Sequence, residues 1–199
     1  MRLLSRARSL SVLAMLLAGA IGIISSTQTW LDVTLNQGSG DPLPVPGASA
    51  IPVLAPLSLA VLALGTSLSI TGLVLRYVFG ALAVVIGGVL ATLTATVVFT
   101  TPTASVASTV TEATGQSGLD AVAALVTSVT QTPWPALTLI DWVLLIVAGA
   151  FVLATARTWR RSGRKYQTDS ASQPAASDSE PLDAIDSWDG LSRGEDPTR

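Results

Sequence analysis

Residues 54–99 read LAPLSLAVLALGTSLSITGLVLRYVFGALAVVIGGVLATLTATVVF, and Arg76 is the only charged residue in this stretch. An α-helix rises about 1.5 Å per residue, so roughly 20 apolar residues cross the ~30 Å hydrocarbon core of a bilayer. The stretch is long enough to cross twice. Because Arg76 interrupts it, the sequence predicts two antiparallel transmembrane helices, 54–75 and 77–99, joined by a cytoplasmic turn at Arg76.

Two further apolar segments, 9–28 and 136–156, flank this pair. Ala18-Gly19-Ala20 resembles a signal-peptide cleavage site, but the apolar run continues through Ile24, which favours an uncleaved helix. Apolar residues make up 49% of the chain and charged residues 12%, a composition typical of a membrane protein. The predicted fold class is therefore all-α: a multi-pass membrane protein with an antiparallel bundle of four transmembrane helices.

The basic residues predict the orientation of this bundle. All eleven Lys and Arg residues lie in 1–8, at Arg76 or in 157–199. In segments 29–53 and 100–135, by contrast, the only charged residues are Asp and Glu. Basic residues stay on the cytoplasmic side during insertion. We therefore expect a protein of the cytoplasmic membrane with both termini inside the cell.

The two outer connections differ in composition. Segment 29–53 is rich in Gly and Pro and is expected to be an extended loop, with Trp30 as an anchor at the headgroups. Segment 100–135 is expected to be a loop with two short amphipathic helices, because two sets of its apolar residues follow helical spacing. These residues are Val106, Val110 and Ala113 in the first set, and Leu119, Val122, Val126 and Val129 in the second.

Small residues recur every fourth position within the predicted spans. In lipid, close approach of helix backbones at small residues supplies much of the packing, so these positions predict helix contacts. Whether the contacts lie within one chain or between copies stays open, and so does a homo-oligomer. The positions are Ala83, Gly87, Ala91 and Ala95; Ala18, Gly22 and Ser26; and Ala150 and Ala154.

Asp141 is the only ionisable residue inside a predicted span and is therefore the candidate for an intramembrane polar site. Its place near the outer end of 136–156 favours an interfacial carboxylate, and a substrate or proton role is the alternative. The chain has no His and no Cys. Because the usual metal ligands and the usual general base are absent, we expect no catalytic residue, no metal, no cofactor and no enzyme activity.

Segment 157–165 is basic, with its charges at helical spacing. If the last helix continues past the bilayer, this spacing places five charges on one face, where they would contact an anionic inner leaflet. These residues are Arg157, Arg160, Arg161, Arg164 and Lys165.

Segment 166–199 is acidic and has the composition of a disordered cytoplasmic tail, which would repel nucleic acid. Within it, Leu182, Ile185, Trp188 and Leu191 recur at every third position among aspartates. A disordered tail has no folding reason to keep these apolar side chains. We therefore expect this segment to become ordered against a cytosolic protein partner, with an idle tail as the alternative.

The end of the tail, Asp186-Ser187-Trp188-Asp189-Gly190-Leu191-Ser192-Arg193-Gly194-Glu195-Asp196-Pro197-Thr198, resembles the closing motif of the tryptophan-associated membrane proteins of actinobacteria. Gly190 and Ser192 depart from the family's Ala and Asp. The Thr29-Trp30 and Trp134-Pro135 pairs and the order of four spans are also similar to the family. The resemblance implies a gene linked to tryptophan biosynthesis, a tail signature that includes Arg193, Glu195 and Asp196, and no established activity.

Two functions are consistent with these features. The first is a non-enzymatic accessory or scaffold linked to tryptophan biosynthesis, which recruits a cytosolic partner through its tail. The alternative is a transporter, or a transporter subunit, for tryptophan or an indole compound. It would work as an oligomer, with Asp141 and the threonines of 77–99 along the path.

Overall fold

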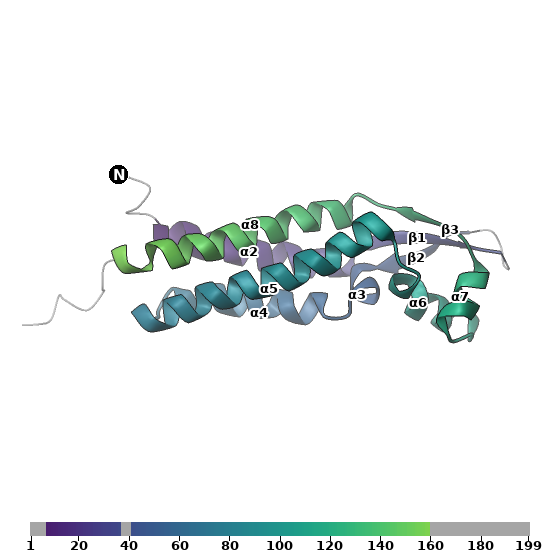
Figure 1. Cartoon of the computed structure of the whole chain (residues 1–199), viewed down its shortest axis with the longest axis horizontal. Coiled ribbons are helices and arrows are strands. Elements are labelled where there is room, and N and C mark those ends of the chain that lie inside the picture. The colour runs from purple at the N-terminus through teal and green to yellow at the C-terminus, as the bar shows by residue number, and fades with distance from the viewer. Residues whose placement is uncertain (1–6, 37–40, 160–199) are drawn as a thin grey trace, which may run out of the picture. The chain divides into compact units, whose positions relative to one another are not determined.

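The computed structural model describes residues 7–36 and 41–159, and the chain is mostly helical there (Figure 1). Three helices are long and apolar enough to cross a membrane: α2 (Ala7–Thr27), α5 (Leu73–Thr100) and α8 (Trp134–Thr155). A further apolar helix, α4 (Leu54–Leu68), has 15 residues and is therefore only about 22 Å long. That length is short of a full hydrocarbon core.

The break between α4 and α5 lies at residues 69–72 and not at Arg76 as predicted. Ser69 follows the last turn of α4, and its hydroxyl donates to the carbonyl of Thr66 at 2.6 Å. Gly72 is extended (φ −74°, ψ 178°) and precedes the first residue of α5. Ile70 and Thr71 are β-branched and Gly72 has no side chain, so the helix propensity is low here and the helix stops although the residues beyond it are apolar. Arg76 consequently lies inside α5, where it is buried.

Small residues bring the long helices together. Ala83 and Gly87 of α5 are buried against α8, as predicted, and a methyl group added at Gly87 would lie 2.9 Å from Ile146 Cγ1. Ala150 and Ala154 are exposed and make no close helix contact within the chain, so for them only a contact between copies stays a prediction. On α8 the buried small residues are instead Ala148 and Gly149.

Gly22 of α2 is the second close approach between helices. A methyl group there would clash with the Ser58 hydroxyl of α4 and would lie 2.5 Å from Cη2 of Trp142 in α8. Three helices therefore meet at this one glycine.

The two outer connections form a sheet, which corrects the all-α prediction. Strands β1 (Thr29–Leu35), β2 (Leu43–Pro46) and β3 (Val126–Gln131) pair antiparallel in the order β2-β1-β3. The prediction assigned Val126 and Val129 to a helix, but the Val-Thr-Ser-Val-Thr run is β-branched and suits a strand.

Short helices complete this region: α3 (Gly47–Ala50), α6 (Ala104–Thr114) and α7 (Leu119–Leu125). Helix α6 contains all three residues of the first predicted apolar set, Val106, Val110 and Ala113. Helix α7 contains only Leu119 and Val122 of the second set. In Figure 1 the sheet, α6 and α7 lie together beyond one end of the long helices, which we call the capped end.

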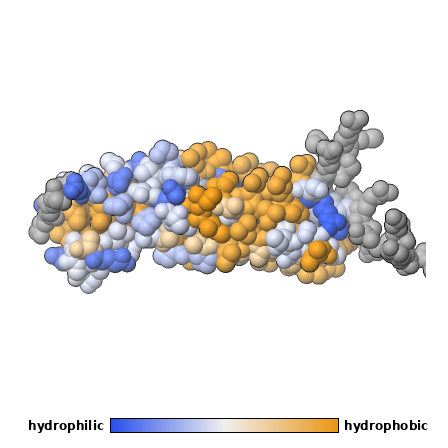
Figure 2. Space-filling view, turned by 180° about the vertical axis from the view of Figure 1, so that it is seen from behind, coloured by the Kyte–Doolittle hydropathy of each residue, from blue (hydrophilic) through white to orange (hydrophobic). Residues whose placement is uncertain are grey.

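The other end, which we call the basic end, carries three arginines. Arg8 lies in the first turn of α2, Arg76 in the first turns of α5, and Arg157 in the 3₁₀ turn Ala156–Thr158 that follows α8. Asp32, Glu112 and Asp120 lie in β1, α6 and α7 at the capped end. Figure 2 shows apolar residues gathered over the helical part of the surface, and more polar residues towards the capped end.

Candidate functional site

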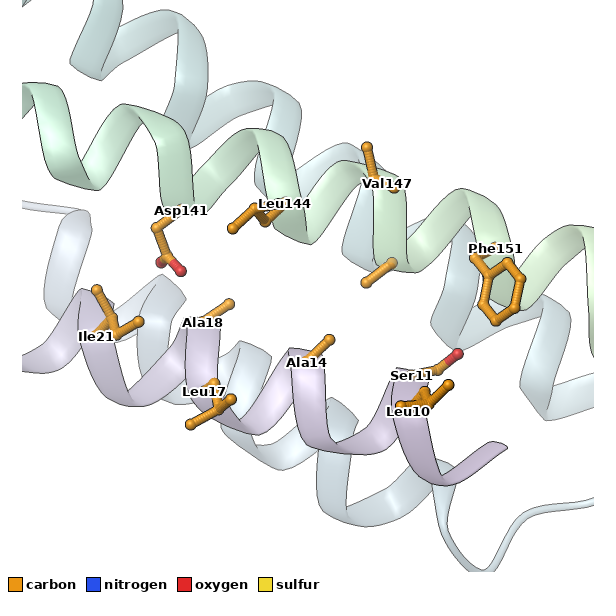
Figure 3. Close-up of a pocket in the computed structure, with 11 residues that line it drawn as sticks. Leu10, Ser11, Ala14, Leu17, Ala18, Ile21, Asp141, Leu144, Val147 and Phe151 are labelled. Carbon is orange, nitrogen blue, oxygen red and sulfur yellow. The ribbon is translucent and has the colours of Figure 1, made fainter. Parts of the chain in front are cut away.

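Asp141 lies in the second turn of α8, about 10 Å along the axis from Trp134. Its side chain is 5% exposed, and no described residue donates a hydrogen bond to its Oδ2 atom. In Figure 3 the carboxyl group points away from α8 towards α2, near Ile21. A carboxyl group that reached water or loop backbone would have partners there. The carboxyl group is therefore enclosed by the helices, and its predicted interfacial position stays a prediction.

The carboxyl group points into a groove between α2 and α8 with a volume of about 410 Å³. Helix α2 contributes one wall and α8 the other, and the two helices run antiparallel (Figure 3). The lining residues are Leu10, Ser11, Ala14, Leu17, Ala18 and Ile21 from α2, and Asp141, Leu144, Val147, Ala148 and Phe151 from α8.

The groove has one polar group near each end. Asp141 marks the half nearer the capped end, and Ser11 marks the end nearer Phe151 (Figure 3). Ser11 is 1% exposed, and no described group forms a hydrogen bond with its hydroxyl. All other lining side chains are apolar, so the site can offer a ligand hydrogen bonds only at these two positions.

The walls of the groove are open on the outer surface of the helices. Leu17, Leu144 and Val147 are each more than half exposed, at 53%, 59% and 59%. Large exposed aliphatic side chains on a membrane-spanning helix face lipid, so the groove is accessible from the hydrocarbon core.

The threonines of α5 do not share this site. The hydroxyls of Thr92, Thr96 and Thr100 donate to backbone carbonyls of the preceding turn of α5, at 2.8, 2.9 and 2.6 Å. This is the usual arrangement for threonine in a helix. Thr94 alone among the threonines of α5 is fully buried, and it does not line the groove.

Trp30 is also placed differently from the prediction. It is fully buried, and its indole N–H lies 3.0 Å from both the carbonyl and the hydroxyl of Ser25. The Ser25 hydroxyl in turn lies 2.5 Å from the hydroxyl of Thr138 in α8. A methyl group at Gly47 would lie 2.7 Å from the indole nitrogen, so this glycine makes room for the ring. These contacts fix the sheet to α2 and α8.

At the basic end, the guanidinium of Arg76 lies 5.1 Å from the centre of the Trp159 ring and donates to the carbonyl of Ala156 at 3.4 Å. Trp159 was not among the residues predicted to have a role. Its position next to a basic segment was the only available signal, since the contact joins residues far apart in the chain.

The predicted lipid-contact segment is described only in part. Arg157 is exposed, but α8 ends at Thr155 and Trp159 has an extended conformation (φ −75°, ψ 123°). The α-helix that would align the five basic residues is therefore interrupted at this point. The remaining residues of the two predicted surfaces lie outside the described residues: Arg160, Arg161, Arg164 and Lys165, and in the tail Leu182, Ile185, Trp188, Leu191, Arg193, Glu195 and Asp196.

Within residues 7–36 and 41–159, no group of three or more His, Cys, Asp or Glu residues could hold a metal ion. The polar groups of the α2/α8 groove are limited to one carboxyl and one hydroxyl, which lie near opposite ends of the groove.

A protein-family model described as tryptophan-associated transmembrane protein matches residues 12–198, which is nearly the whole chain. The match confirms the resemblance that the C-terminal motif indicated. No curated protein and no solved structure matches the chain.

Proposed function

Because the chain belongs to the family of tryptophan-associated transmembrane proteins, we propose that it is a non-enzymatic accessory protein of the cytoplasmic membrane, linked to tryptophan biosynthesis. In this proposal the helices anchor the protein, and the acidic C-terminal tail recruits a cytosolic partner to the inner leaflet.

The observation that carries the proposal is the separation of charge between the two ends of the helices. Arg8, Arg76 and Arg157 share the basic end, and the chain continues from that end into the basic segment and the tail. The positive-inside rule assigns a basic end to the cytoplasm. The tail is then available to cytosolic proteins, and Arg157 with the basic residues after it is available to anionic lipid.

The recruiting role rests on the composition of the tail. Leu182, Ile185, Trp188 and Leu191 alternate with acids in a segment that is otherwise polar. Segments of this kind bury their apolar residues only against another protein, and they bind with modest affinity because ordering costs entropy. A tryptophan-pathway enzyme is the partner that the family name favours.

The test is crosslinking in native cells followed by purification of the full chain. We expect wild-type protein to retain a tryptophan-pathway enzyme, and Trp188→Ala to lose it, because the indole is the largest apolar group of the segment. Ser187→Ala is the matched control, since it changes a neighbouring residue without removing apolar surface. The same set of captured proteins after deletion of residues 183–199 would refute recruitment.

Transport is a second candidate, and the buried carboxyl group of Asp141 favours it. Ionisable residues within membrane helices commonly mark substrate or proton pathways. Because the groove opens towards lipid, a transported molecule would enter laterally, and a continuous path would need an oligomer or a partner. This candidate predicts that Asp141→Asn abolishes flux of tryptophan or indole while the protein still reaches the membrane. Normal flux in that variant rejects it.

A further inference from the structure

We infer that the groove between α2 and α8 binds an amphiphile that carries one extended hydrocarbon chain and one hydrogen-bond donor. This inference goes beyond recruitment by the tail and does not depend on it. It also concerns binding alone, so it can hold whether or not the protein transports anything.

The unpaired carboxyl oxygen of Asp141 is the reason to infer a hydrogen-bond donor on the ligand. Its Oδ2 atom is buried, points into the groove and accepts no hydrogen bond from any described residue. Whatever its protonation state, a carboxyl group keeps an oxygen that accepts hydrogen bonds, and leaving that oxygen unpaired in hydrocarbon is unfavourable. An ammonium or hydroxyl group of a ligand in the groove would supply the missing donor.

The residues that line the groove indicate that the ligand has an extended hydrocarbon chain. The floor of the groove is made of small residues, among them Ala14, Ala18 and Ala148, and its walls are mostly aliphatic. From Asp141 to Phe151 the groove follows ten residues of helix, or about 15 Å. A long, narrow and open space of about 410 Å³ suits a flexible chain that enters from the bilayer, and the volume is within the usual range for small-molecule sites.

A second copy of this protein offers Asp141 no cation among its described residues. Copies inserted in the same orientation place Arg8, Arg76 and Arg157 at the basic end, far along the axis from Asp141. The described residues of a second copy therefore provide no cation at the depth of the carboxyl group. A ligand free to move along the helices does not have this restriction.

The experiment uses the full chain, reconstituted in lipid nanodiscs and labelled with photoreactive dodecylamine. Photoreactive dodecyl methyl ether is the matched probe, since it has the same chain without a donor. We expect saturable labelling of α2 and α8 peptides by the amine, competed by unlabelled dodecylamine, and much weaker labelling by the ether. Equal labelling of the same peptides by both probes would overturn the requirement for a donor.

Three variants separate the donor contact from the fit of the chain. Asp141→Asn should weaken binding of the amine about tenfold, because the amide oxygen still accepts a hydrogen bond but lacks the negative charge that strengthens a bond to an ammonium group. Ala14→Phe should abolish labelling of the groove by filling its floor. Val143→Phe is the control, because Val143 is 50% exposed on α8 but does not line the groove. If Asp141→Asn and Ala14→Phe are both monodisperse and bind the amine as well as the wild-type protein does, the inference is overturned.

The chain contains no cysteine, so a single Leu144→Cys substitution reports on what covers the groove in native membranes. We expect this cysteine to react with a lipid-soluble maleimide, and dodecylamine to slow the reaction. A disulfide-linked dimer that dodecylamine does not prevent would identify a second copy as the occupant and overturn the assignment to a small amphiphile.

Discussion

At the scale of single residues, two buried polar side chains find their partners inside the protein and not in the headgroup layer. Trp30 donates to Ser25, and Arg76 contacts the Trp159 ring and the Ala156 carbonyl. The carbonyls at the C-terminus of α8 carry partial negative charge, so a cation is favourable there. Trp and Arg side chains also anchor membrane proteins at the headgroup layer. The sequence pattern alone therefore predicted that Trp30 and Arg76 contact lipid headgroups.

Removing the indole N–H of Trp30 should destabilise the junction between the sheet and the helices. We expect Trp30→Phe to lower the free energy of unfolding by about 1 kcal/mol, because the buried oxygens of Ser25 lose the indole N–H as one of their hydrogen-bond partners. The thermal midpoint in detergent, calibrated by denaturant titration, measures this loss. Trp134→Phe serves as the control, since Trp134 is only partly buried at the start of α8. Equal midpoints for the two variants would contradict the role assigned to the Trp30 hydrogen bonds.

The pairing of Arg76 with Trp159 can be measured by a double-mutant cycle. A cation over an indole ring that is shielded from water contributes up to about 2 kcal/mol. We expect Arg76→Met and Trp159→Leu to be destabilising separately and to show a coupling of about 1 kcal/mol together. Arg76→Lys should restore only part of the stability, because an ammonium lacks the planar face that stacks on the ring. Strict additivity of the two single changes would show that the 5.1 Å contact contributes nothing.

At the scale of elements, the helices pack through glycines whose neighbours leave no room for a side chain. A methyl group at Gly149 would lie 2.9 Å from Val84 Cγ2 and 3.0 Å from the carbonyl of Gly80. Since lipid provides no hydrophobic drive for helices to associate, such close contacts supply much of the packing energy. Helix α2 packs against both α4 and α8, and α5 packs against α8. Neighbouring helices in space are therefore α4 and α2, α2 and α8, and α8 and α5.

Adjacent glycines in α5 provide a matched test of this packing. Gly87 faces Ile146 and Leu145, whereas Gly88 has nothing within 4 Å of an added methyl group. We expect Gly87→Leu to cost several kcal/mol or to prevent folding, because overpacking a tight contact costs about 1–3 kcal/mol even for smaller insertions. Gly88→Leu should leave stability within about 0.5 kcal/mol of wild type. Monodispersity and thermal midpoint in detergent distinguish the two, and similar behaviour of both variants would refute the α5–α8 contact.

At the scale of the whole molecule, charge is divided between the two ends of the helices, and this division predicts the orientation in the membrane. With no native cysteine, single substitutions give clean reporters. Gln116→Cys in the outer connection should react with a membrane-impermeant maleimide on intact cells, and Ser162→Cys should react only after the membrane is opened. Labelling of Ser162→Cys on intact cells would contradict the predicted orientation, and with it the cytoplasmic location of the tail.

The sequence predicted the three long helices because continuous apolar runs are an unambiguous signal in a membrane protein. It did not predict the end of α4, since Ser69 and Gly72 lie in a stretch whose average hydropathy stays high. The sheet was missed because β1 and β3 pair across residues far apart in the chain, and because the spacing of Val126 and Val129 in β3 also fits part of a helix period.

For the candidate site, Asp141 could be identified from its charge alone. The opposite wall of the groove could not, because nothing in the local sequence of α2 indicates which of its faces meets α8. Ser11 and Ile21 are ordinary membrane-helix residues until the packing of the two helices brings them close to Phe151 and Asp141.

The central strand has a consequence for how the protein is made. Strand β1 acquires β2 within a few residues, but its other neighbour, β3, is synthesised only after α4, α5, α6 and α7. At typical elongation rates the ribosome needs on the order of ten seconds to cover that interval. During this time one edge of β1 is left without hydrogen-bond partners. Nascent chains therefore pass through a stage at which a chaperone, or a neighbouring nascent copy, competes with β3 for the same row of amides.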